Sequence, residues 1–288
     1  MYQTPKHQGS DSEEGTLTTS HPPETQNLNP IPENLKYWNI AAAVFQYGSA
    51  AALFYLSSQA DTKWPLYTNY PLTLDDRSDE PDTFAVPGPD ELASYSVTWY
   101  SAVFIALSAL DHTACVVFRD TYEYYLARHQ NPFRWAEYAL SASLMRVMIA
   151  QLSGVTDIHL LFMVFSAAAT TMIVGGCLHE SVNAGARADG QKQNWFPFLA
   201  SWLPHLSSWL VIFSYFLKAV SEADPPNFVW AIVFILFVLD GSFALLFWLQ
   251  WAKIGPFSDY IKGEKGFIVL SFTAKALLAW INYGGGSR

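Results

Sequence analysis

The chain has 288 residues, of which 51% are hydrophobic and only 14% are charged, whereas about 25% of residues are charged in soluble domains. Its formal net charge is −9, and much of the acid lies in the N-terminal region and between Asp61 and Glu91. Since no basic patch accompanies this acid, a nucleic-acid partner is not expected. A soluble globular domain is excluded too, because the composition is typical of a protein that crosses a membrane several times.

The first predicted element along the chain is a disordered N-terminal tail. Residues 1–33 are polar and rich in Pro, Ser, Thr and Glu, which predicts disorder. A spanning helix needs about 20 mainly apolar residues, and we expect seven such helices within a domain at 34–284. The segments are 36–58, 92–118, 133–153, 157–180, 196–220, 227–251 and 262–283. The loop at 59–91 holds five prolines and is long enough to have structure of its own. Residues 285–288 are expected to form a flexible end.

Positive charges predict the orientation of this all-α bundle. If the N-terminus is cytoplasmic, ten lysines and arginines lie on the cytoplasmic side and three on the outer side. Cytoplasmic loops carry the excess of positive charge in membrane proteins. We therefore expect a cytoplasmic N-terminus, an extracellular C-terminus and an extracellular 59–91 loop, in the plasma membrane.

Lys275 stands in the middle of the last apolar segment, with about ten apolar-rich residues on each side. Ionisable groups at this depth usually mark function. A desolvated amine is nucleophilic enough to form a Schiff base with an aldehyde. The alternatives are a side chain that snorkels to the interface and a structural ion pair.

Glu137, near the start of the third segment, is the first candidate for the anion that a protonated Schiff base requires. Arg134 lies three residues before it on the same face, so an Arg–Glu pair at the membrane surface is the alternative. Ser141 follows Glu137 by four residues, and Ser271 precedes Lys275 by four. We expect both hydroxyls to share a face with the charged groups and to lie near the Schiff base.

Further ionisable residues lie at membrane depth. Asp111 and His112 are adjacent and point about 100° apart on a helix, and His112 is either a proton acceptor or a hydrogen-bonded core residue. Arg146 lies nine residues beyond Glu137 on the opposite face, about 13 Å along the axis, so Asp157 or a group on the second helix is its expected partner. Asp240 is deep in the sixth segment.

Two more histidines, His159 and His205, are expected to be packing or interface residues. Their spacing gives no zinc motif, and no metal site is predicted.

Several segments together resemble the heliorhodopsins over nearly all of residues 34–284. They are NPFRWAEYALSASLM, AQLSGVTDI, PFLASW, FALLFWLQW, DYIKGEKGFIVLS and AKALLAW. The resemblance implies an inverted seven-helix rhodopsin with all-trans retinal bound through Lys275 and Glu137 as counterion. It also implies a homodimer, surrounded by membrane lipid, that forms through the fourth and fifth helices.

The resemblance further implies the surroundings of the chromophore. The Schiff base would lie near Ser141, Ser271, His112 and Tyr138. The retinal pocket would contain Ser143, Met172, Gly176, Trp209, Asp240 and Phe243.

The chain departs from the family pattern at several of these places. Gln46 stands where a histidine is frequent, which puts a two-histidine proton acceptor in doubt. Asp111 and Arg146 replace apolar residues, Asp240-Gly241 replace an aromatic residue and an asparagine, and Ser208 replaces a proline. The extra carboxylates Asp240 and Asp111 could share the counterion role.

The resemblance implies that light isomerises the retinal, that the Schiff base leaves Glu137 and loses its proton for a time, and that helix contacts rearrange. The family generally has slow photocycles and little pumping, which predicts sensory or signalling output. The rival hypothesis is light-driven or light-gated proton transport along Asp111, Arg146 and Asp240. No enzyme is predicted, because the sequence has no nucleophile–base pair and no phosphate loop.

Overall fold

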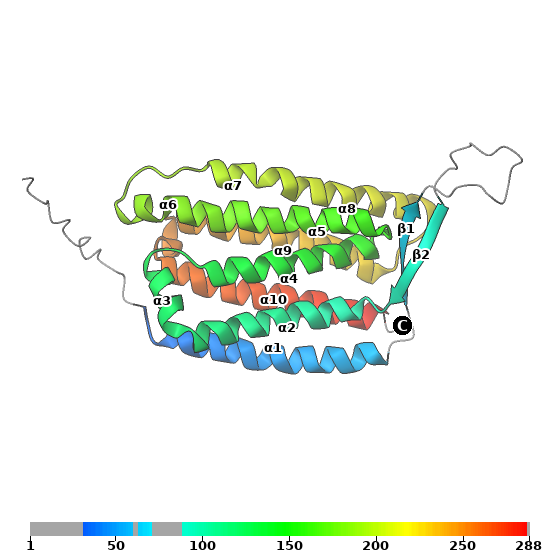
Figure 1. Cartoon of the computed structure of the whole chain (residues 1–288), viewed down its shortest axis with the longest axis horizontal. Coiled ribbons are helices and arrows are strands. Elements are labelled where there is room, and N and C mark those ends of the chain that lie inside the picture. The colour runs from blue at the N-terminus through cyan, green and yellow to red at the C-terminus, as the bar shows by residue number, and fades with distance from the viewer. Residues whose placement is uncertain (1–30, 60–62, 71–87, 287–288) are drawn as a thin grey trace, which may run out of the picture.

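A computed structural model describes residues 31–59, 63–70 and 88–286. Long helices run side by side (Figure 1), and the described residues form seven helical rods. They are α1 (Asn34–Ser58), α2 (Thr98–Val117), α4 (Pro132–Leu152), the run α5–η1–α6 (Ile158–Met172, Ile173–Leu178, His179–Ala188), the pair α7–α8 (Phe196–Ala200, Trp202–Glu222), α9 (Asn227–Trp251) and α10 (Tyr260–Gly286). The predicted seven-helix bundle is confirmed.

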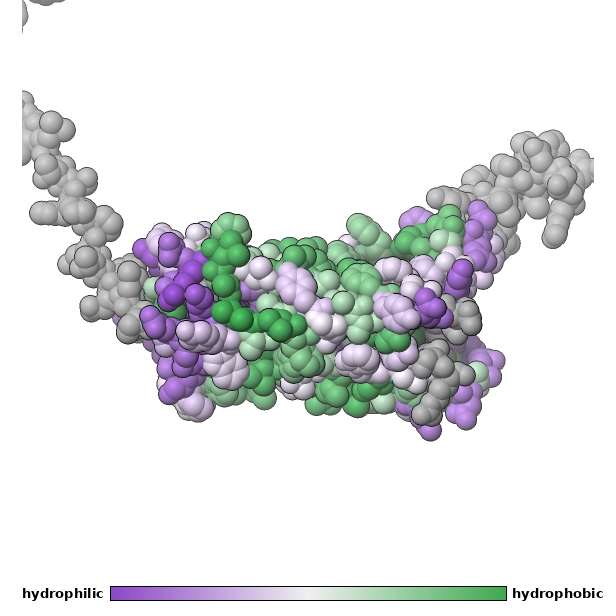
Figure 2. Space-filling view, turned by 90° about the horizontal axis from the view of Figure 1, so that it is seen from below, coloured by the Kyte–Doolittle hydropathy of each residue, from purple (hydrophilic) through white to green (hydrophobic). Residues whose placement is uncertain are grey.

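The bundle has a surface suited to a membrane. Six of the described helical runs are long and apolar enough to span one. The seventh, α4, is more polar because it carries Arg134, Glu137 and Arg146, all of which are buried. Figure 2 shows a hydrophobic band between two hydrophilic ends. Charged side chains of α4 thus face the protein interior, while the surface meets lipid.

The two ends of the bundle are distinct. We call the end where α1 begins the N-end, and the opposite end the hairpin end, because β1 (Trp64–Tyr70) and β2 (Gly88–Tyr95) form an antiparallel hairpin there (Figure 1). The hairpin confirms that the predicted 59–91 loop has structure of its own. The backbone N–H of Tyr67 donates to the carbonyl of Thr156 at 2.9 Å, which ties β1 to the turn between α4 and α5.

Several boundaries differ from the prediction. The second span begins at Thr98 rather than at residue 92, because the residues before it pair in β2. The fourth continues to Ala188 through a π-helical turn. A short helix, α3 (Arg119–Ala127), was not predicted. The last helix continues to Gly286, two residues beyond the predicted end of the helical domain at 284. The predicted disorder of residues 1–30 lies outside the described residues.

Capping explains where α4 and α5 begin. Asn131 is the N-cap of α4, and its side-chain oxygen accepts from the backbone N–H of Arg134 at 3.1 Å, with Pro132 as the first helical residue. Asp157 caps α5 in the same way through Leu160. The turn between these helices passes through Gly154 at φ = +108°, a conformation that favours glycine.

Two apolar clusters fill the bundle. One occupies the hairpin half and includes Phe104, Ile212 and Phe216, and the other occupies the N-end half and includes Trp135, Phe247 and Trp251. The ionisable residues of the site lie where these clusters meet.

Candidate functional site

Lys275 is buried in the middle of α10, and three oxygen atoms surround its amine. The Nζ atom lies 2.7 Å from Oε1 of Glu137, 2.9 Å from Oγ of Ser271 and 3.1 Å from Oγ of Ser108. Only 3% of Lys275 and 7% of Glu137 is exposed. The snorkelling alternative is therefore wrong, because the amine ends in the protein interior and not at an interface.

Glu137 and Arg134 do not pair, although three residues separate them on α4. Arg134 donates from Nη2 to Glu180 at 2.6 Å and from Nη1 to Glu264. The N-cap residue Asn131 supports both carboxylates, because its backbone N–H donates to Glu180 and its side-chain amide to Glu264, each at 2.7 Å. The surface Arg–Glu alternative is thus wrong, and Glu137 is left to face Lys275.

The hydroxyl groups near Lys275 agree in part with the prediction. Ser271 contacts the amine as expected. Ser141 lines the cavity beside it, and its buried Oγ has no hydrogen-bond partner among the described residues. Ser108 on α2 was missed, although it lies four residues before His112, on the same helix face. The Tyr138 ring lies under the amine, 5.2 Å from its centroid to Nζ.

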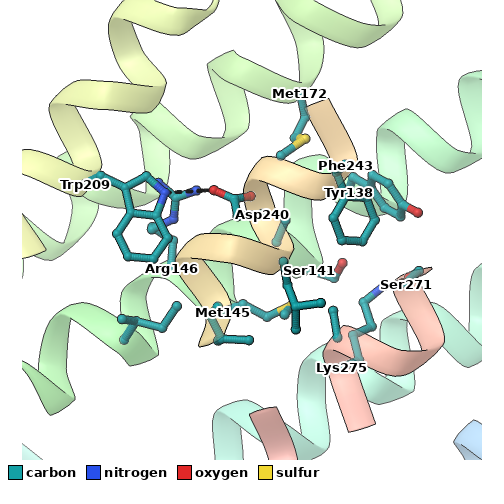
Figure 3. Close-up of a pocket in the computed structure, with 15 residues that line it drawn as sticks. Tyr138, Ser141, Met145, Arg146, Met172, Trp209, Asp240, Phe243, Ser271 and Lys275 are labelled. Carbon is teal, nitrogen blue, oxygen red and sulfur yellow. Dashed lines mark hydrogen bonds and ion pairs between the residues drawn. The ribbon is translucent and has the colours of Figure 1, made fainter. Parts of the chain in front are cut away.

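A cavity of about 530 Å³, here called the lysine cavity, opens from Lys275 toward α8 and α9 (Figure 3). Its lining combines residues predicted for the pocket with Met145 and Arg146. The predicted members are Tyr138, Ser141, Met172, Trp209, Asp240, Phe243 and Ser271. Its mainly apolar lining with a few polar groups is typical of sites for small ligands.

A second cavity of about 520 Å³, the aromatic cavity, shares Tyr138, Met172, Asp240 and Phe243 with the first. The predicted Gly176 lines it, as do several aromatic residues that sequence reasoning did not find: Trp135, Phe198, Trp202, Phe247 and Phe267. A Cβ atom at Gly176 would lie 2.3 Å from the Trp135 ring, so only glycine fits against this ring.

Ser143, predicted for the retinal pocket, lines neither of these two cavities. Its hydroxyl donates to the carbonyl of Ala139 at 2.7 Å, and it belongs to neither cavity lining. The reason is helical geometry, since two residues after Ser141 a side chain points about 200° around the helix.

Arg146 and Asp240 form a second buried ion pair. Arg146 donates from Nη2 to Oδ2 of Asp240 and from Nη1 to Ser208 at 2.6 Å. The indole N–H of Trp209 donates to the same Oδ2 at 2.8 Å, and His205 Nε2 lies 3.6 Å from it. The expected partners of Arg146, Asp157 or a group on α2, are therefore wrong. Asp240 bonds to Arg146 and makes no hydrogen bond to Lys275, which separates it from the counterion position.

A smaller polar cavity lies behind Glu137, toward the N-end. Asp111, His112, Asn39, Glu264 and Ser271 line it together with Arg134 and Glu137. His112 Nδ1 is 2.8 Å from Oδ1 of Asn39 on α1. The buried side-chain amide of Gln46 has no hydrogen-bond partner among the described residues. Asp111 and His112 thus line one cavity with Glu137, whereas Asp240 lines the lysine cavity.

These features fit an attached retinal. The site offers one buried amine, a carboxylate in contact with it, an unpartnered Ser141 hydroxyl, and an adjoining apolar cavity. Lys275 would hold the aldehyde end, and the apolar side chains of Met145, Met172 and Phe243 would contact the polyene. Over the described ranges, no cluster of His, Cys, Asp and Glu could hold a metal ion.

The bundle is similar in fold to known rhodopsins. The crystal structure of the light-driven proton pump rhodopsin of Coccomyxa subellipsoidea aligns with a TM-score of 0.56 at 14% identity, over 88% of this chain and 97% of that one. No curated protein matches the chain. Fold and site together define a seven-helix membrane protein with a rhodopsin-like fold and a buried lysine–carboxylate pair beside an apolar cavity.

The family model for heliorhodopsins matches residues 35–286, most of the chain. The chain belongs to the heliorhodopsin family, and the resemblance seen in the sequence is confirmed. It is therefore an integral membrane protein and a retinal-based photoreceptor or pump.

Proposed function

We propose that the protein is a light sensor in which all-trans retinal is attached to Lys275 and the output is a signal. The contact of 2.7 Å between Lys275 Nζ and Glu137 Oε1, at the mouth of the lysine cavity, is the observation that carries this proposal. Retinal, when bound, supplies the absorption of visible light and a double-bond isomerisation.

The residues of the chain would control charge and protons around the attachment nitrogen. The free amine donates to Glu137, Ser271 and Ser108. The single N–H of a Schiff base would donate to Glu137, which balances the positive charge, and the two serine hydroxyls would remain beside it. Ser141 offers a further hydroxyl once that nitrogen moves. Oε1 of Glu137 is the nearest acidic acceptor for its proton, and the polar cavity with Asp111 and His112 lies directly behind.

The positions of Asp111, Arg146 and Asp240 favour sensing over proton transport. Asp111 is in the polar cavity, whereas Arg146 and Asp240 satisfy one another beyond Lys275. Between this ion pair and the hairpin end, the core is filled by buried apolar side chains such as Ile149, Ile212 and Phe216. A proton that leaves Glu137 would thus return from the polar cavity, which agrees with a slow photocycle.

Reconstitution with all-trans retinal tests the proposal. We expect a visible absorption band that is absent from Lys275→Ala, a slow return to the dark state after a flash, and no photocurrent at any voltage in clamped cells. A band that survives Lys275→Ala would refute retinal attachment, whereas a light-dependent current would refute the purely sensory output and support transport.

The remaining parts of the proposal concern the cell. Lysines and arginines gather at the N-end, so we place this end in the cytoplasm of a plasma-membrane protein. Large apolar residues such as Phe162, Leu203 and Leu210 are exposed on α5 and α8, and we propose this face for a homodimer. We assign no enzymatic activity to the chain. Topology reporters fused to the two ends of the chain test the orientation, and cross-linking across α8 tests the homodimer.

A further inference from the structure

The ion pair between Arg146 and Asp240 lies in the wall of the lysine cavity, not in a closed part of the core. Both residues line that cavity, and Asp240 also lines the aromatic cavity. The side chain of Arg146 is 4% exposed and that of Asp240 is 19% exposed. In Figure 3 one carboxylate oxygen of Asp240 meets Arg146, while the other points toward Met172 and Phe243.

The two charges have fixed positions. Arg146 is held by Ser208 as well as by Asp240, and its guanidinium carbon lies 4.5 Å over the Trp209 ring. Oδ2 of Asp240 accepts from both Arg146 and Trp209. Three helices, α4, α8 and α9, contribute to this cluster, so it forms a rigid dipole at one side of the cavity.

Stability alone gives little reason for such a pair. Taking two charges out of water costs several kcal/mol per ion, and apolar residues of similar volume often replace a buried pair without loss. The position of the pair along the cavity gives it a stronger effect on a bound ligand than on stability, because in a low-dielectric site a charge acts strongly over a few ångströms.

We propose that the Arg146–Asp240 pair tunes the colour of the bound retinal, with the two charges acting in opposite directions. This inference rests on the proposed attachment at Lys275. Excitation of a conjugated cation moves positive charge from the nitrogen along the polyene. Glu137 at the nitrogen favours the ground state, whereas Asp240, farther along the cavity, favours the excited state. Arg146 opposes Asp240, so the pair as a whole has a small effect.

Absorption spectra of three variants test this inference. Asp240→Asn should move the band to shorter wavelength and Arg146→Gln to longer wavelength, each by on the order of ten nanometres. The double variant should lie near the wild type. Ser208→Ala, which removes a hydrogen bond from Arg146 and no charge, is the matched control and should not shift the band.

The outcomes separate this inference from the proposed function. Single shifts of opposite sign that cancel in the double variant support it. Equal-sign shifts, or a shift in Ser208→Ala as large as in the charge variants, would mean that the cluster only shapes the cavity and would overturn it. The unfolding temperature of the retinal-free protein identifies variants that fail to fold. Where a charge-removing variant fails, Asp240→Glu and Arg146→Lys are used in its place. Both keep the two charges and must keep the wild-type colour. A wild type without any visible band would instead refute the attachment at Lys275.

Discussion

Arg134 and Glu137 are one helical turn apart on α4, yet each faces a different partner. Arg134 joins Glu180 and Glu264 at the N-end, while Glu137 joins Lys275. Two carboxylates therefore bind the two terminal nitrogens of the arginine, and the lysine has a carboxylate to itself. This division of partners makes Glu137 available as the counterion.

The Lys275–Glu137 pair should show strong coupling in retinal-free protein. Removing one partner of a buried pair leaves an uncompensated charge and costs about 3–5 kcal/mol. We expect Lys275→Met and Glu137→Gln each to lower the unfolding free energy by about this amount, and the double variant to lose clearly less than the sum. Reversible unfolding in detergent measures the unfolding free energy of each variant. If the losses of the two single variants simply add in the double variant, the two side chains do not interact.

Glu137→Gln should move the visible band of the retinal-bound protein to longer wavelength, because the negative charge beside the attachment nitrogen is lost while the shape is kept. Glu123, a partly exposed residue that pairs with Arg119 on α3, gives a control, and Glu123→Gln should leave the spectrum unchanged. If Glu137→Gln also left it unchanged, another carboxylate would be the counterion, with Asp111 in the polar cavity the first to test.

The centre of the site could be predicted from sequence because it depends on local spacing. Lys275 is recognisable by its depth in an apolar segment, and Ser271 by the interval of four residues on the same helix. Glu137 could be identified because it is a carboxylate in a neighbouring predicted span. The helix count and most boundaries follow from the length of the apolar runs.

What could not be predicted depends on how separate helices are rotated and packed. Arg146 and Asp240 are 94 residues apart, and nothing local to either residue selects the other. Ser108 meets Lys275 only because α2 turns that face toward α10. The pairing of Trp64 with Tyr95 is equally non-local, which explains why the start of α2 was placed too early.

Arg134 should be a structural rather than a spectral residue. Its guanidinium links α4 to α6 and α10 through Glu180 and Glu264, all three residues being buried. Arg134→Met leaves two buried carboxylates without a cation, so we expect a loss of about 3–5 kcal/mol. Arg128→Met, at a partly exposed position over the Tyr124 ring, is the control and should cost less than about 1 kcal/mol. A large colour change in Arg134→Met would contradict this assignment.

Gly176 should control the width of the aromatic cavity. A Cβ atom there would lie 2.3 Å from the Trp135 ring, so Gly176→Ala must displace this ring. Overpacking of this kind costs about 1–3 kcal/mol, and the displaced indole narrows the space shared with Tyr138 and Phe243. We expect slower and weaker binding of added retinal, measured as growth of the visible band.

Gly185 lies farther along the same helical run and provides the matched control for Gly176. A Cβ atom at Gly185 meets nothing within 4 Å. Gly185→Ala should therefore bind retinal like the wild type and gain up to about 1 kcal/mol, because alanine is the better helix former. Equal retinal binding by both alanine variants would show that the Trp135 side of the cavity is not part of the binding site, and would confine retinal to the lysine cavity.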